Sequence, residues 1–242
     1  MSLADAFEMA LDPALLFERA FSLSAHDWQR GYLRETRPTV VLKGRQTGAS
    51  TAAAALAIHT TVYAANVNAV VISPTLKQST EIATRARIGL RNLGVQLTQD
   101  SAAMLRLANG SRILSLPGTA RSVRGWTAKL LILDEAAFIA PETIVAARAL
   151  VATGGRLVVQ STPAGESGDF YAIVTADDPE WARIVIRSDE VSTITAEFLE
   201  AERRAMSPDE YAMEYECTFG KAGASLFSVD KIAALILRGP KP

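Results

Sequence analysis

Cysteine and histidine are scarce in this 242-residue sequence. The only cysteine is Cys217, which excludes a disulfide framework, and the two histidines, His26 and His59, leave too few ligands for a structural zinc site. No run approaches the roughly 20 apolar residues that span a bilayer. The first ten residues also lack a basic start followed by an apolar stretch. We therefore expect a soluble protein of a reducing compartment, outside any secreted pathway.

The composition supports a full hydrophobic core. The sequence is 49% hydrophobic and 21% charged, which suits one α/β domain with an appendage, or two small subdomains. The net charge of −1 hides an asymmetry, because residues 75–129 hold nine basic and two acidic side chains, whereas residues 166–216 hold fourteen acidic and four basic ones. One interpretation is that residues 75–129 form a basic surface that binds a polyanion, beside an acidic lobe formed by residues 166–216. The alternative is that both segments are ordinary solvated surfaces.

Short apolar runs alternate with segments of helical spacing. The first forty residues are helical in patches, and the expected strands that follow are residues 39–42, 69–72, 129–133, 156–160 and 184–186. The expected helices are residues 51–65, 79–93, 142–150, 195–205 and 208–217. Asn109-Gly110 predicts a hairpin between residues 105–107 and 112–114. This alternation indicates an α/β fold with a mostly parallel sheet flanked by helices, followed after about residue 188 by a small helical appendage.

A glycine-containing loop joins the first strand to a helix. Residues 43–51 read Lys-Gly-Arg-Gln-Thr-Gly-Ala-Ser-Thr. Glycines let backbone N–H groups turn toward a phosphate, and the N-terminus of the following helix adds a favourable dipole. Ser50 stands where a Walker A hydroxyl reaches Mg²⁺, but Ala49 replaces the usual lysine and Lys43 the usual first glycine. The alternative is an ordinary strand-to-helix turn with Ser50 as its N-cap.

Two adjacent carboxylates follow the strand at residues 129–133. Asp134 and Glu135 come directly after aliphatic residues, at the end of the strand where parallel α/β sheets bind ligands. Asp134 can hold Mg²⁺, and Glu135 can polarise an attacking water. The alternative is an acidic N-cap followed by a glutamate in a first helical turn.

A third polar loop ends the strand at residues 156–160. Ser161-Thr162-Pro163 places two hydroxyls there, where they could sense a γ-phosphate. All three loops leave the same ends of buried strands, in the order phosphate loop, Asp-Glu, Ser-Thr. Because that order is expected of RecA-like ATPases, the sequence predicts a P-loop ATPase that uses ATP and Mg²⁺.

With these motifs the chain resembles the large terminase subunit of tailed bacteriophages, the motor that packs DNA into a preformed capsid. The resemblance covers nearly the whole chain. The segments that resemble the family's phosphate loop, basic-glycine segment, Walker B motif, coupling motif and pre-nuclease segments are residues 44–50, 122–125, 133–138, 160–165, 214–217 and 224–227. It implies a RecA-like P-loop ATPase core at residues 1–188. Residues 189–242 would form a lid subdomain and the start of a linker to an absent nuclease domain.

The resemblance also implies roles for single residues. Glu135 is the expected catalytic carboxylate, and Arg124 the arginine that enters a neighbour's active site, with Arg121 as its alternate. Arg45 is the first choice for the missing lysine charge, and Lys43 the second. For Arg124 the alternative is a solvated loop arginine.

The remaining contacts are expected with the nucleotide and its metal. The implied nucleotide contacts are Gln29, Lys43, Gly44, Arg45, Gln46, Thr47, Gly48, Ala49, Ser50, Thr51, Asp134, Ser161 and Thr162. Of these, Ser50 and Asp134 would also hold Mg²⁺, and Gln29 would bond the adenine edge. The alternative for Gln29 is a surface glutamine beside a buried Trp28.

DNA contact is expected to be made by basic residues on one face, because a motor that follows phosphates has no need to read bases. The candidates are Lys77, Arg85, Arg87, Arg91 and Arg121, although any one could be a solvated surface residue. The implied partners are double-stranded DNA, further copies of the chain in a ring on a capsid portal, and the small terminase subunit. The implied location is the host cytoplasm, without a membrane. Because the chain ends without a nuclease carboxylate cluster, we expect the ATPase portion alone, which does not cut DNA.

Two other functions compete with this prediction. A helicase-like translocase would share the Asp-Glu and Ser-Thr motifs, but the chain is too short for a second RecA domain. A non-catalytic P-loop assembly module is favoured by Ala49 and opposed by Glu135.

Overall fold

Eight strands form one sheet in the computed structural model, which describes residues 3–123 and 125–220. The strands are β1 Thr39–Lys43, β2 Asn68–Ser73, β3 Leu97–Asp100, β4 Met104–Leu107, β5 Arg112–Pro117, β6 Ala128–Asp134, β7 Val151–Ser161 and β8 Ala182–Ile186. Their order across the sheet is β3-β4-β5-β2-β6-β7-β1-β8. The six strands β5, β2, β6, β7, β1 and β8 run parallel to one another. The pairs β3–β4 and β4–β5 are antiparallel. The predicted mostly parallel sheet and the predicted β4–β5 hairpin are confirmed.

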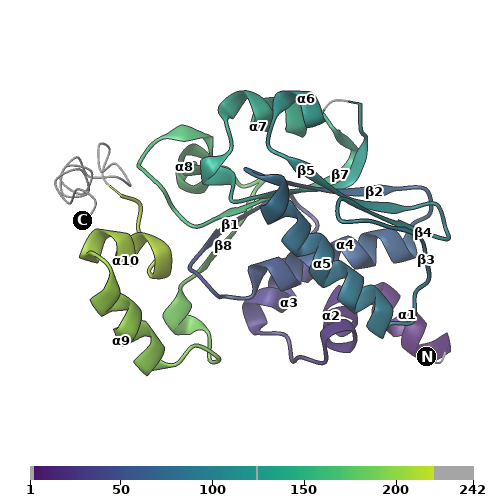
Figure 1. Ribbon diagram of the computed structural model, residues 1–242, viewed down its shortest axis with the longest axis horizontal. Coiled ribbons are helices and arrows are strands. Elements are labelled where there is room, and N and C mark those ends of the chain that lie inside the picture. Colours follow the sequence, from purple (N-terminus) through teal and green to yellow (C-terminus); the bar gives the residue numbers. More distant parts are fainter. Residues whose placement is uncertain (1–2, 124, 221–242) are drawn as a thin grey trace, which may run out of the picture.

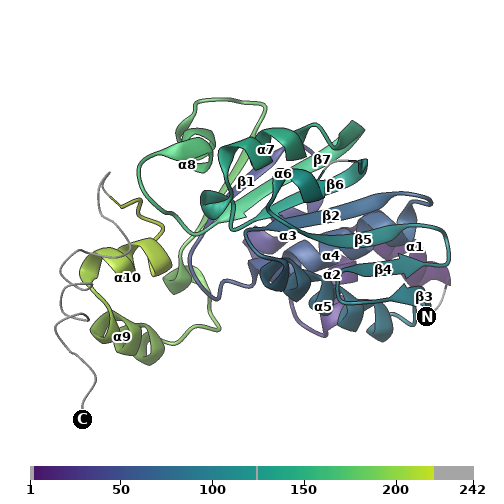
Figure 2. The same ribbon diagram turned by 45° about the horizontal axis from the view of Figure 1, so that its top comes forward.

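Helices cover both faces of the sheet, as Figures 1 and 2 show. The α-helices are α1 Leu3–Leu11, α2 Pro13–Phe21, α3 Asp27–Arg34, α4 Ala49–Tyr63, α5 Leu76–Asn92, α6 Ala120–Val123, α7 Pro141–Arg148, α8 Gly168–Thr175, α9 Ala196–Ala205 and α10 Pro208–Tyr215. Two short 3₁₀ helices are η1 Ala136–Phe138 and η2 Ser188–Glu190. Helices α1 to α5 lie on one face and α6 to α8 on the other, so the layers are helix, sheet, helix. No helix among the described residues is long and apolar enough to cross a membrane.

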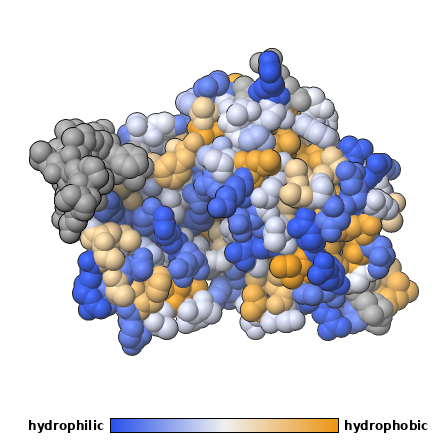
Figure 3. All heavy atoms as spheres, in the orientation of Figure 1, coloured by the Kyte–Doolittle hydropathy of each residue, from blue (hydrophilic) through white to orange (hydrophobic). Residues whose placement is uncertain are grey.

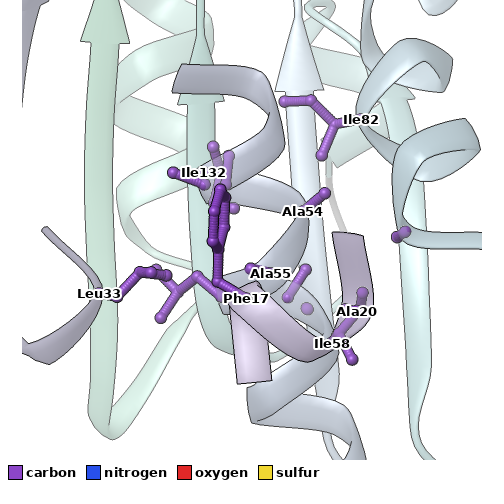
Figure 4. Close-up of a cluster of buried hydrophobic side chains, with 14 of the residues drawn as sticks. Phe17, Ala20, Leu33, Ala54, Ala55, Ile58, Ile82 and Ile132 are labelled. Atoms are coloured by element: carbon purple, nitrogen blue, oxygen red, sulfur yellow. The ribbon is translucent and has the colours of Figure 1, made fainter. Parts of the chain in front are cut away.

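The central strands are buried on both sides because their side chains alternate between two cores. In β6, Leu130 and Ile132 join the core beneath α1 to α5, whereas Leu131 and Leu133 join the core beneath α6 to α8. Figure 4 shows the first core, where Phe17 reaches toward the sheet between the helices. Continuous apolar runs are typical of such doubly covered parallel strands, which is why the sequence located them.

A lobe of two helices, α9 and α10, lies to one side of the sheet, next to β8 (Figure 1). Hydrogen bonds fasten the chain around this lobe to two loops of the sheet. Arg45 N–H donates to the carbonyl of Glu214 at 2.7 Å, and Gly220 N–H donates to the carbonyl of Ala164 at 2.8 Å. The two helices agree with the predicted helical lid, but the division of the chain at residue 188 stays a prediction.

The opposite end of the molecule carries exposed apolar side chains. Beside the N-terminus, α1 presents Leu3, Phe7 and Leu11 to solvent, and Figure 3 shows apolar surface there. They recur once per helical turn, because residues four apart lie on the same face of a helix. Nothing in the described residues covers this stripe.

Candidate functional site

The loop between β1 and α4 wraps the N-terminus of that helix. Two of its residues adopt left-handed backbone conformations, Gln46 with φ 60° and Gly48 with φ 86°. Gly48 is the N-cap of α4, which begins at Ala49. The alternative in which Ser50 caps the helix is therefore wrong, and the Ser50 side chain is available to the cleft in front of the loop.

Gly44 is required by close approach of the backbone. A Cβ atom there would lie 2.4 Å from Ser188 Oγ and 2.9 Å from the carbonyl oxygen of Tyr215. Ser188 Oγ in turn donates to the carbonyl of Arg45 at 2.8 Å. The loop is thus held between the sheet and the segment that carries α9 and α10.

A buried lysine and a carboxylate meet across neighbouring loops. Lys43 Nζ lies 2.6 Å from Glu135 Oε1, and the Lys43 side chain is only 9% exposed. Glu135 has φ 53°, in the left-handed region that glutamate rarely adopts. Its side chain makes no capping hydrogen bond to η1. Asp134 ends β6 and Glu135 stands at the N-cap position of η1, so the alternative of an Asp134 cap followed by Glu135 in a first helical turn is wrong. The Glu135 side chain bonds to Lys43, at the start of the phosphate loop.

Asp134 lies behind Glu135 and is buried. Burial raises the pKa of Asp134 and the neighbouring Glu135 adds to the rise, whereas Lys43 and a hydrogen bond from Gln160 oppose it. Gln160 Nε2 donates to Asp134 Oδ1 at 2.7 Å, because the two residues are register partners on β6 and β7. The amide oxygen of the same side chain, Gln160 Oε1, is buried and has no hydrogen-bond partner among the residues that the structure describes. It is an acceptor that a bound donor, such as a water, could satisfy.

The predicted hydroxyl pair ends β7 beside the carboxylates. Ser161 Oγ donates to Glu135 Oε2 at 3.2 Å and accepts from Ala137 N–H at 3.3 Å. Thr162 faces the cleft. Phosphate loop, Asp-Glu and Ser-Thr therefore converge at one end of β1, β6 and β7, which are neighbours in the sheet.

Arg45 points away from the buried cluster and toward the helical lobe. Its guanidinium forms two hydrogen bonds to Glu214, from Nε to Oε2 at 2.7 Å and from Nη2 to Oε1 at 3.2 Å. The Glu214 carboxylate raises the pKa of Arg45, although the arginine side chain is more than half exposed. The two candidates for the missing lysine charge thus each carry an acidic partner.

Gln29 is buried at 3% exposure, so the alternative of a surface glutamine is wrong. Its Oε1 accepts from His26 N–H at 2.9 Å, and its Nε2 lies 3.5 Å from the carbonyl of Gly48. Trp28 is only partly buried and packs edge-on near Tyr32. Gln29 therefore lies directly behind the phosphate loop.

A cleft of about 750 Å³ opens in front of these loops. The predicted residues that line it are Lys43, Gly44, Arg45, Gln46, Thr47, Gly48, Ala49, Ser50, Thr51, Glu135 and Thr162. Gln29, Asp134 and Ser161 lie behind that lining. Arg124 is outside the described residues, as are residues 224–227, and Arg121 lies exposed on α6, away from the cleft lining.

The basic residues of α5 do not share one face. Lys77 is exposed, whereas Arg87 pairs with Asp100 at 2.6 Å and borders, with Arg91, a separate surface hollow. Arg85 instead lines the cleft of the phosphate loop. The predicted group is therefore split between two sides of the helix.

This arrangement suits a phosphate chain and its cation. Free N–H groups at the start of α4 attract phosphate, and Ser50 and Asp134 offer a hydroxyl and a carboxylate for a hard divalent ion. Among the described residues no three His, Cys, Asp or Glu side chains cluster as metal ligands, so phosphate oxygens and water would have to complete the coordination.

The sequence did not identify several residues of the cleft. Glu214, Gln78, Arg85 and Phe138 line it, and Gln160 bonds to Asp134 behind it; none of these was a predicted nucleotide ligand. Gln160 had a signal, because it directly precedes Ser161 at the end of a buried strand. Glu214 had none, since its partner Arg45 is 169 positions away.

Comparison with protein families identifies one match. A family model described as terminase large subunit, T4likevirus-type, N-terminal, matches residues 40–234. No curated protein sequence matches the chain.

Several solved structures have the same fold. The large terminase ATPase domain of Thermus phage P74-26 superposes with a TM-score of 0.71 at 23% identity, covering 87% of this chain and 100% of that one. The large terminase of a thermophilic bacteriophage in complex with ADP gives 0.65 at 13% identity, covering 86% and 53%. That of bacteriophage HK97 gives 0.62 at 17% identity, covering 84% and 50%. The chain thus spans about half the length of the latter two proteins, and their fold is the RecA-like one expected from the sequence.

Proposed function

The chain belongs to the family of T4likevirus-type terminase large subunits, as their N-terminal domain, and we propose that it is an ATP-hydrolysing motor that drives double-stranded DNA into a viral capsid. The observation that carries the proposal is a 750 Å³ cleft lined by Ser50 and Glu135, with Asp134 buried directly behind Glu135, at the ends of neighbouring parallel strands. A relative of the same fold was solved with ADP and with ATP-γ-S, which supports a nucleotide as the occupant.

Glu135 is the proposed general base. It accepts a proton from water while the water oxygen bonds to the γ-phosphorus, and the bond from that phosphorus to the β–γ bridging oxygen breaks, so that ADP leaves with the electron pair. Lys43 pairs with Glu135 at 2.6 Å in the structure, and phosphate oxygens would compete for that ammonium. Nucleotide entry would therefore free the base at the moment when it is needed.

Because Ala49 occupies the position of the usual lysine, other side chains would neutralise the negative charge of the phosphates. Arg45 is the first choice, because its planar fork suits phosphate oxygens, and Lys43 is the second. Ser50 and Asp134 would hold Mg²⁺, which supplies charge neutralisation and orients the phosphates. Gln29 would bond the adenine edge, and Arg124 of a neighbouring copy would complete the site, with Arg121 as the alternate.

Coupling to movement would pass through the α9–α10 lobe, proposed as the lid. Arg45 holds this lobe through Glu214, and Ala164, close after Ser161-Thr162, holds it through Gly220. Both loops touch the proposed phosphate site, so loss of the γ-phosphate would alter both attachments. The proposed setting is a ring of copies on a capsid portal in the host cytoplasm, with the small terminase subunit and DNA as partners. Lys77, Arg87 and Arg91 are retained as DNA candidates.

The test is Mg²⁺-dependent ATP turnover by the chain over a range of protein concentrations, beside Glu135→Gln. We expect turnover to rise per molecule with concentration and to fall at least about 100-fold in the variant, with ATP binding retained. The exposed Glu142→Gln on α7 is the matched control and should keep the wild-type rate. ATP binding without turnover at any concentration would favour the non-catalytic assembly module, and absence of ATP binding would remove the nucleotide assignment.

A further inference from the structure

Three cationic side chains line the cleft, and they differ in what already holds them. Lys43 is paired with Glu135, and Arg45 with Glu214. The third is Arg85, whose Nη1 donates to Thr51 Oγ1 at 3.2 Å. Among the described residues Arg85 has no carboxylate within ion-pairing distance. It is therefore a cation whose hydrogen-bond partner in the cleft is a neutral hydroxyl.

The position of Arg85 is fixed by helix packing. It lies on α5, between the fully buried Ile82 and Ala86, which join the core. One turn further, α5 approaches α4 so closely that a Cβ at Gly89 would lie 2.6 Å from Ile58 Cδ1. Because two tightly packed helices set its distance from the phosphate loop, Arg85 faces the start of α4 without any movement of the backbone.

Thr51, the partner of Arg85, directly follows Ser50 in the first turn of α4. The Thr51 N–H donates to the carbonyl of Gly48 at 3.1 Å, and the residues of that turn line the cleft, where the positive end of the helix dipole favours phosphate. A guanidinium bonded to Thr51 therefore lies beside the part of the cleft in which a phosphate chain would bind. Gln78, two turns before Arg85 on the same helix, lines the cleft as well.

The cost of engaging each cation differs. The carboxylates held by Lys43 and Arg45 compete with phosphate for those cations, whereas Arg85 gives up only one hydrogen bond to a neutral hydroxyl. The position that usually supplies the lysine is Ala49, so the loop itself brings no unpaired cation. A charge from the neighbouring helix can offset that deficit, since a charge-assisted bond to phosphate is about twice as strong as a neutral one.

We infer that Arg85, on α5, is a phosphate ligand of the nucleotide site. Its positive charge replaces part of the charge that a lysine would supply at the position of Ala49. This inference rests on the proposed function, because it takes ATP as the occupant of the cleft. If Arg85 binds phosphate of the nucleotide, it is no longer one of the expected DNA contacts. Arg87 and Arg91 stay candidates, because they line a separate surface hollow.

The test measures binding of ADP and of adenylyl imidodiphosphate, neither of which is hydrolysed, by calorimetry in the presence of Mg²⁺. Arg85→Ala should weaken the triphosphate analogue about tenfold or more, and Arg85→Lys should recover part of the loss. Arg106→Ala is the matched control, because Arg106 is an exposed arginine on β4 outside the cleft lining. Far-ultraviolet circular dichroism and the melting temperature verify that each variant folds.

A DNA arm distinguishes the other source of phosphate. Affinity for a duplex of random sequence, and its dependence on salt concentration, should be the same for Arg85→Ala and wild type. Unchanged nucleotide affinity overturns the inference, most clearly if duplex binding falls instead, since Arg85 would then follow DNA. A wild-type chain that binds neither nucleotide removes the proposed function itself, whereas wild-type binding with an unaffected Arg85→Ala removes this inference alone.

Discussion

Asp134 is a carboxylate enclosed between two strands, and burial raises its pKa above the ordinary value. A raised pKa in the folded state means that the folded chain binds the proton more tightly than the unfolded chain. Ionised Asp134 therefore destabilises the fold above its folded pKa, and the penalty disappears as the pH falls below the ordinary value of 3.8. A bound divalent cation would offset the same penalty.

Asp134→Asn should consequently stabilise the metal-free chain at pH 7 while removing ATP turnover. The melting temperature should rise by about 2 to 4 °C for each kcal/mol of penalty removed, and the rise should shrink toward zero below about pH 4. Thermal unfolding in chelator at several pH values measures the difference. Asp177→Asn, at an exposed position, is the control. A variant that melts lower than wild type at pH 7 would contradict the prediction.

At this scale the sequence identified residue types but not their partners. Ser50, Asp134 and Glu135 were predictable, because each stands at the end of an apolar strand or at the start of a helix. The Lys43–Glu135 pair was not, since it joins positions 92 apart and depends on which strands are neighbours. The position of Arg85 in the cleft lining was not predictable either, because helical spacing alone cannot tell which side of α5 meets α4.

Helix α10 contacts the phosphate loop through its backbone, where Arg45 N–H donates to the Glu214 carbonyl, and through the Glu214 side chain. Glu214 holds the guanidinium of Arg45 with two hydrogen bonds, and phosphate oxygens would compete for the same donors. Because the arginine side chain is 56% exposed, solvent screens the pair, whose contribution to stability is at most about 1 kcal/mol.

Glu214→Gln should release Arg45 and tighten ATP binding by up to about fivefold, which corresponds to that 1 kcal/mol. The melting temperature should fall only slightly. Glu216→Gln breaks a similar ion pair, with Arg203 at 2.9 Å, elsewhere in the lobe and should leave ATP affinity unchanged. Calorimetric titration of both variants compares them. Weaker ATP binding in Glu214→Gln would mean that the carboxylate supports the site rather than competing with it.

Strands with continuous apolar runs and most of the helices after residue 48 were predicted well, whereas β3, the first part of β7 and α8 were not. β3 was missed because it is a polar edge strand with three exposed residues. β7 extends to Val151, well before the predicted start at residue 156, because pairing with β6 through a bulge accommodates Gly154 and Gly155. α8 went unpredicted, although its residues cover part of the second core. Tertiary pairing decided these cases, and local sequence does not record it.

The whole molecule contains the proposed base Glu135, but the arginine proposed to complete the site comes from another copy. Such head-to-tail contacts form a ring where the rotation between neighbours closes, and each interface then joins two different surfaces of neighbouring subunits. The isolated chain should accordingly turn ATP over slowly, and loss of either partner residue should be complementable.

Glu135→Gln and Arg124→Ala should each be inactive alone and regain activity when mixed. At equal amounts about one quarter of the interfaces would combine an intact glutamate with an intact arginine, so the rate should approach that fraction of wild type. Steady-state ATP turnover at high protein concentration, across mixing ratios, measures the recovery. The same mixture made with Arg121→Ala decides between the two arginines. Failure of both mixtures to recover would place the activating group elsewhere.

Glu135 pays for its position with a left-handed backbone, at φ 53°, that costs a side chain about 1 to 2 kcal/mol relative to glycine. Selection for folding stability therefore favours glycine at this position, whereas selection for the proposed ATP turnover favours glutamate. A library propagated only for heat resistance should drift to glycine or asparagine there, whereas a library propagated for genome packaging should hold glutamate. The frequency of glutamate after several rounds would then report which of the two pressures a lineage has experienced.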